Sequence, residues 1–75
     1  MTEKDLKIIE DAEREGIPIF VLTAKDLIAV NAITSYYNAC CWAKCNDQHC
    51  NAIERRIEDF KTWKALNPDK MKLPD

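Results

Sequence analysis

Hydrophobic residues in the second half of the chain form two helical stripes that cannot share one face. The first stripe consists of Val30, Ile33, Tyr37, Cys40 and Cys41, and the second consists of Cys50, Ile53, Ile57 and Phe60. At about 100° per residue, the two stripes would point roughly 200° apart on one unbroken helix. A straight helix could not bury both against one core. We therefore expect the chain to turn near residues 44–47 and to form an antiparallel helical hairpin.

An N-terminal helix is predicted over residues 3–15. Thr2 followed by Asp5 resembles a capping box, in which the two residues satisfy each other's backbone N–H groups. Gly16 suits the left-handed residue that commonly follows a helix. The apolar line of this helix is thin, so we expect it to pack on the rest of the domain by a narrow edge.

The other helices are placed by two asparagines. Asn31 and Asn46 are suitable N-caps, which predicts helices over residues 32–44 and 47–66. A short helical turn is expected to begin at Thr23. Together with the N-terminal helix, these elements predict a mostly helical protein.

Residues 17–23 are rich in β-branched and aromatic side chains and are predicted to form one short strand. Both sides of this strand are apolar, with Ile19, Phe20, Val21 and Leu22. The chain offers no second strand of this kind, so its ladder of backbone groups lacks a partner. We expect antiparallel pairing with the same strand of a second copy, in an α+β homodimer. The alternative is a buried extended segment bonded to local side chains and water.

A chain of 75 residues has room for one small domain, which we place at residues 1–68, with 69–75 as a mobile tail. Such a domain buries only about 60% of the surface that its unfolded chain exposes. Its stability is expected to be marginal unless a partner chain, a metal or a disulfide adds to it.

Charge and hydropathy argue against several partners. The net charge is -2, and the basic residues of the last third alternate with acidic ones, so a nucleic-acid backbone would meet no positive stripe. The first residues are too charged for a secretory signal, and no apolar run approaches the roughly 20 residues that span a bilayer. We expect a cytoplasmic protein without membrane contact, in which cysteines are reduced thiols or metal ligands.

The cysteines gather at the predicted bend. There Cys41 should face Cys50, Cys45 lies in the turn, and His49 follows one turn into the next helix. A zinc site could be built from Cys41, Cys45 and Cys50 with His49 or Cys40, although the spacing matches no standard zinc motif. A Cys41–Cys50 disulfide is a further alternative. We favour buried thiols that fill the space between the helices, and predict neither cofactor nor metal.

No arrangement typical of an enzyme is evident. The chain has one histidine, no glycine-rich loop and little room for a concave substrate site. Trp42 and Trp63 lie off the buried stripes, where they either mark an interaction surface or are covered by the N-terminal helix or strand. We therefore predict a non-enzymatic protein-interaction module with Ile19, Phe20, Val21, Leu22, Trp42 and Trp63 at its interface. A small zinc-stabilised regulatory module is the alternative.

The order of motifs resembles that of small uncharacterised bacterial and prophage proteins. The shared pattern begins with Pro18-Ile19-Phe20-Val21-Leu22-Thr23-Ala24-Lys25-Asp26 and continues with Tyr36-Tyr37 and Phe60-Lys61-Thr62-Trp63. The resemblance covers most of the chain after the first helix. It implies a domain that can stand alone, of phage origin, and it implies no activity.

Overall fold

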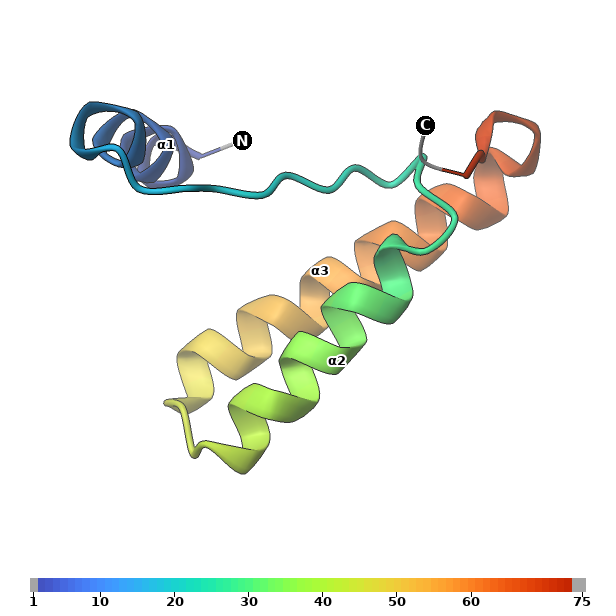
Figure 1. Ribbon diagram of the computed structural model, residues 1–75. Coiled ribbons are helices and arrows are strands. Elements are labelled where there is room, and N and C mark those ends of the chain that lie inside the picture. Colours follow the sequence, from blue (N-terminus) through green and yellow to red (C-terminus); the bar gives the residue numbers. More distant parts are fainter. Residues whose placement is uncertain (1, 74–75) are drawn as a thin grey trace.

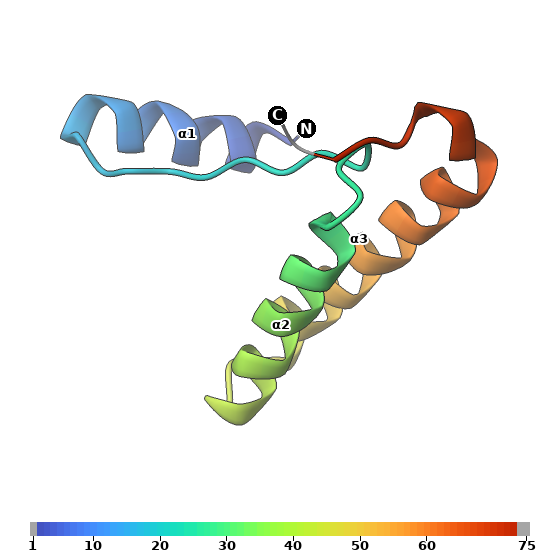
Figure 2. The same cartoon turned by 45° about the vertical axis from the view of Figure 1, so that its right-hand side comes forward.

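The computed structural model describes residues 2–73, which form three α-helices and one short 3₁₀-helix. Helix α1 spans Glu3–Glu15, α2 spans Ala29–Trp42, α3 spans Asp47–Leu66, and η1 spans Pro68–Lys70. Helices α2 and α3 lie side by side and antiparallel, whereas α1 lies apart from them (Figure 1). An extended segment runs back along α1 to the start of α2 (Figure 2). The fold is therefore a helical hairpin with an arm made of α1 and the segment 17–23.

The predicted start and end of α1 are confirmed. The Thr2 hydroxyl accepts a hydrogen bond from the Asp5 N–H at 3.1 Å, and the Asp5 carboxylate accepts one from the Thr2 N–H at 3.4 Å. Gly16 follows the helix with φ of 70°, a left-handed conformation that glycine adopts without strain. The Ile17 N–H then donates to the Ala12 carbonyl at 2.8 Å, which turns the chain back along the helix.

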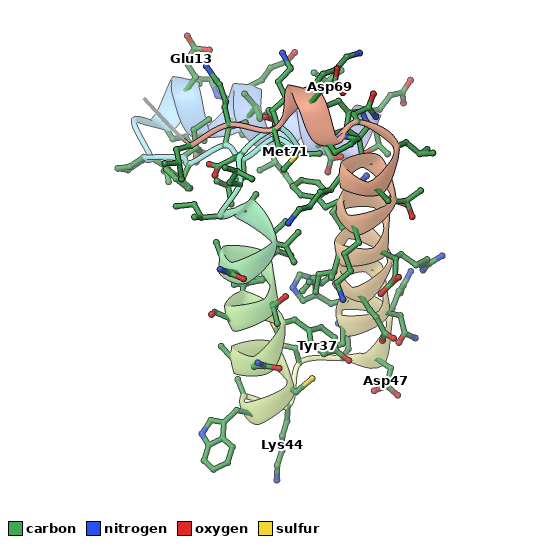
Figure 3. The ribbon with its side chains drawn as sticks, turned by 90° about the vertical axis from the view of Figure 1, so that its right-hand side faces the viewer. Glu13, Tyr37, Lys44, Asp47, Asp69 and Met71 are labelled. Atoms are coloured by element: carbon green, nitrogen blue, oxygen red, sulfur yellow. The ribbon has the colours of Figure 1, made fainter. Side chains whose placement is uncertain are left out.

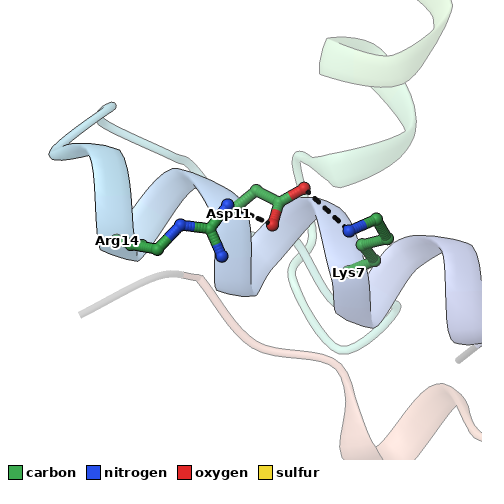
Figure 4. A network of polar contacts seen from close by, with 3 residues as sticks. All are labelled: Lys7, Asp11 and Arg14. Atoms are coloured by element: carbon green, nitrogen blue, oxygen red, sulfur yellow. Dashed lines mark hydrogen bonds and ion pairs between the residues drawn. The ribbon is translucent and has the colours of Figure 1, made fainter.

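Ion pairs cover one side of α1. Asp11 accepts from Arg14 at 2.8 Å and lies 3.5 Å from the Lys7 ammonium (Figure 4). At about 100° per residue, these three residues lie on the side of the helix opposite Ile9, and Ile8 lies roughly a quarter turn from them. Exposed pairs of this kind add little to stability. The charged side of α1 therefore faces solvent and not the extended segment.

The predicted hairpin is confirmed, and the bounds of α3 are those predicted. The Asn46 side chain caps α3 by accepting from the His49 N–H at 2.8 Å. The bend before it includes Lys44, which has φ of 59°. Figure 3 shows Lys44 and Asp47 at the end of the hairpin away from α1.

The predicted start of α2 is wrong. The helix begins at Ala29, after an Ile28 N-cap that provides no side-chain bond, and Asn31 lies inside the helix. The Asp26 carboxylate accepts instead from the Ile28 N–H at 2.8 Å and so prepares the helix one turn earlier. Residues 24–28 form turns rather than the expected helical turn.

The predicted strand is also wrong, and with it the α+β fold and the pairing of strands between copies. Among residues 2–73 there is no strand and no sheet, so the described chain is a helical protein. Residues 17–23 are extended, as their β-branched side chains favour. A strand also needs a neighbouring backbone, and no backbone hydrogen bond joins residues 18–22 to another described residue.

The segment after η1 contacts the start of the hairpin. The Lys72 N–H donates to the Lys25 carbonyl, and the Leu27 N–H donates to the Lys72 carbonyl, both at 2.9 Å. Met71 is half-buried beside this contact. Mobility of the tail 69–75 stays a prediction, and residues 74–75 lie outside the described part of the chain.

The core is very small for the length of the chain. Among the described residues, only Ala12, Ala29, Cys40 and Ile57 are buried. The accessible surface is 6326 Å², whereas folded monomers of this mass expose about 4,700 Å². The radius of gyration is 13.8 Å, against about 11 Å for a compact domain of this length. The chain therefore exposes about 1,600 Å² more than a compact monomer would.

Candidate functional site

A continuous apolar surface lies between α1 and the extended segment. Its hollow is lined by one polar residue, Asp5, and by six hydrophobic residues, which we call the apolar face: Ile8, Ile9, Ile19, Phe20, Val21 and Leu22. Phe20 is 85% exposed and Val21 64% exposed, which is unusual for side chains of this size. Such a patch is typical of a surface that binds another molecule.

The apolar surface continues onto the hairpin. Leu22 lines a second hollow together with Ile33 of α2 and Phe60 of α3, and the charged residues Asp5 and Arg56 border it. The three hydrophobic side chains are half-buried. Leu22 thus connects the apolar face of the arm to the seam of the hairpin, and the exposed surface extends over both parts of the fold.

The predicted interface residues have different surroundings. Ile19, Phe20, Val21 and Leu22 all lie on the apolar face, where their contact with a partner stays a prediction. Trp63 is half-buried and borders the turn at Thr23 and Ala24. Trp42 is 89% exposed at the last residue of α2, so neither α1 nor the extended segment covers it.

Ile8 and Ile9 are part of the apolar face that the sequence did not single out as interface residues. This adjacent pair could have indicated a second apolar surface, because neighbouring residues on a helix point about 100° apart and cannot both face one narrow core. Ile8 is 55% exposed and Ile9 is half-buried.

The four cysteines gather at the bend of the hairpin. Cys40 is buried and Cys50 half-buried, as expected of thiols that fill space between helices, whereas Cys41 and Cys45 are exposed. The Cys50 thiol donates to the Cys45 carbonyl at 3.8 Å, and the Cys45 N–H donates to the Cys40 carbonyl at 3.0 Å. These bonds connect Cys40, Cys45 and Cys50, and Cys41 is the chain neighbour of Cys40; we call the four residues the thiol cluster.

Two tyrosines join α2 to α3 next to the thiol cluster. The Tyr37 hydroxyl, which lies between the helices in Figure 3, donates to the Glu54 carboxylate at 3.3 Å. The Tyr36 hydroxyl lies 3.3 Å from Nε2 of His49, and their rings meet edge to face. One nitrogen of the imidazole is thus engaged with the Tyr36 phenol and not with a thiol.

Two residues of the thiol cluster, Cys45 and Cys50, have a raised pKa. The hydrogen bond to Cys40 is the main cause that raises the pKa of Cys45, and partial burial is the main cause that raises the pKa of Cys50. A hydrogen bond to Cys41, with the charge of Glu54 nearby, raises the pKa of Tyr37 to about 12. Since the thiolate is the reactive form, Cys45 and Cys50 are not set up as nucleophiles.

The residues of the zinc alternative do not converge. Among residues 2–73, no three side chains of His, Cys, Asp or Glu are arranged so that they could hold a metal ion. Cys41, Cys45, His49 and Cys50 lie near the same bend, yet His49 is directed to Tyr36. The zinc alternative gains no support from this arrangement and stays a prediction.

Replacing Cys40 by alanine is expected to speed modification of Cys45. The hydrogen bond to Cys40 holds the pKa of Cys45 up, so its loss lowers that pKa and increases the thiolate fraction near pH 8. The rate constant of Cys45 alkylation, followed by peptide mass spectrometry, should rise several-fold. Ala39→Ser, on an exposed neighbour, serves as the control and should leave the rate unchanged. An unchanged rate in Cys40→Ala would contradict the hydrogen-bonded cluster.

No protein-family model, curated protein or solved structure matches this chain. The resemblance to small bacterial and prophage proteins stays a prediction. Within residues 2–73, none of the helices has both the length and the apolar character needed to cross a bilayer.

Proposed function

We propose that this chain is a non-enzymatic protein-interaction module, active in the cytoplasm, that binds a protein through the apolar face. The observation that supports this most is the exposed surface, about 1,600 Å² larger than a compact monomer of this mass would have. An excess of this size corresponds to the area that one partner contributes to a large protein interface.

The chemistry of the face favours a protein as the ligand. Its residues are aliphatic or aromatic, and Asp5 is the one charged residue that lines the hollow. Protein interfaces have such centres, depleted in charge and anchored by a few large side chains. A nucleic acid would need a basic surface instead, and the net charge of the chain is -2.

The thiol cluster supports a structural role beside this binding function. Cys40 is buried, and partial burial raises the pKa of the half-buried Cys50, so these two side chains pack between the helices as small hydrophobic groups. The cluster lies at the bend, away from the apolar face. The hairpin would then act as the scaffold for the arm that binds.

A photoreactive side chain at position 20 tests this function. The change replaces Phe20, which is 85% exposed on the apolar face, by benzoylphenylalanine. We expect irradiation of expressing cells to give one discrete protein adduct, identified by mass spectrometry and reproduced with the two purified chains. The same group at Ser35, an exposed position on α2, is the control and should give none. Absence of any adduct at position 20 would contradict the proposed function.

A further inference from the structure

We infer that the partner bound by the apolar face is a second copy of this chain, related to the first by a two-fold axis. This inference rests on the proposed function, because it names the occupant of the same face. It differs from the strand pairing expected from the sequence, since it relies on side-chain packing of the arm and requires no shared sheet.

The exposed area fits a homodimer. Each chain exposes about 1,600 Å² more than a compact monomer of its mass. If two copies cover this excess on each other, the interface buries about 3,200 Å² in total, within the range of obligate homodimers. Such interfaces resemble a domain core cut in half. The small core of this chain, with four buried residues among those described, is what one half would have.

The shape of the face suits a contact with itself. A two-fold interface uses the same patch on both subunits, so the patch must carry both a projection and the hollow that receives it. Phe20 projects, with 85% of its surface exposed, and it stands beside the hollow that Ile8, Ile9 and Ile19 help to line. In an antiparallel approach, Phe20 of each copy can enter the hollow of the other.

The charges of the arm permit this approach. The ion pairs of Lys7, Asp11 and Arg14 lie on the side of α1 opposite Ile9 of the apolar face. Asp5, the charged residue of the hollow, has its carboxylate 3.4 Å from the Thr2 N–H, inside the capping box of α1. In each copy this carboxylate is held at the N-terminal end of α1, where the helix dipole favours a negative charge.

Sedimentation equilibrium of the purified full chain tests the inference. Wild-type protein should have twice the monomer mass of 8.7 kDa. Phe20→Ser should raise the dissociation constant of the dimer by about 100-fold or more, as expected for a central aromatic anchor. Trp42→Ser is the matched control: it removes an equally exposed aromatic at the bend of the hairpin and should leave the dimer intact.

A second measurement covers the case in which Phe20→Ser unfolds. The purified chain, unchanged except for benzoylphenylalanine at position 20, should form an adduct between two chains on irradiation. This adduct should map to α1 of the other copy. An adduct that maps to the hairpin bend, or a dimer weakened by Trp42→Ser and unaffected by Phe20→Ser, would overturn the assignment of the face.

A monomeric wild-type protein would overturn the second copy as partner. If position 20 then still formed one discrete adduct with a different, identified protein in cells, the proposed function would stand with another occupant. If position 20 formed no adduct, both the proposed function and the second copy as partner would be contradicted. The experiment therefore distinguishes failure of the dimer from failure of the proposed function.

Discussion

Replacing Ile57 by alanine is expected to lower the free energy of unfolding by about 2–4 kcal/mol. Ile57 is 7% exposed on α3 and is the largest of the four buried residues. The loss has two parts: the burial of the removed methyl and methylene groups no longer stabilises the fold, and the cavity that remains loses packing contacts. Urea unfolding followed by circular dichroism would measure it. Because association would make stability depend on concentration, all variants should be compared at one protein concentration.

Ile53→Ala is the control for this prediction. Ile53 belongs to the same stripe one turn earlier, but it is only half-buried. Its truncation removes less buried surface, so the loss should be clearly smaller than at Ile57. Equal losses at the two positions would mean that the hairpin packs differently from the structure described above.

Ala29→Leu is expected to lower the free energy of unfolding by about 1–3 kcal/mol. Ala29 is fully buried at the start of α2, where its N–H donates to the Asp26 carbonyl at 3.2 Å. A larger side chain at a fully buried position must displace its neighbours. The melting temperature by circular dichroism would report the effect. Ala32→Leu, at an exposed position in the next turn of the same helix, should have almost none.

Local signals in the sequence predicted α1 and α3 to the residue. In both helices a short polar side chain immediately before the first turn bonds to a backbone N–H three residues later: Thr2 to Asp5 and Asn46 to His49. Such bonds depend on neighbouring residues alone, so they can be read without knowledge of the fold. The hairpin could be predicted in the same way, because two hydrophobic stripes that point in different directions require a turn between them.

Two causes explain the errors: a partner backbone that the described chain does not supply, and a local bond that competes with the predicted N-cap. The β-branched residues of 17–23 do adopt an extended backbone, but a strand depends on a second backbone that no described residue supplies. Asn31 has the right chemistry for an N-cap, yet Asp26 started the helix earlier through the Ile28 N–H. The contact of Lys72 with residues 25–27 has no sequence signal, because it uses backbone groups alone.

The candidate site was predicted in part for the same reason. Phe20 and its neighbours stood out as a run of large apolar residues, and they do lie on the exposed face. The contribution of Ile8 and Ile9 depends on how the chain turns at Gly16 and returns along α1. At the bend, the exposure of Cys41 and the engagement of His49 with Tyr36 depend on the rotation of α2 against α3.

The backbone contact between Lys72 and residues 25–27 has a consequence for the order of folding. It joins positions far apart in the chain, and closing such a loop from an unfolded chain carries a large entropic cost. Once the hairpin forms from local contacts, Trp63 in the last turn of α3 borders residues 23–25, which precede α2. The remaining loop is then short. The chain should therefore fold as fast as its hairpin, in spite of this distant contact.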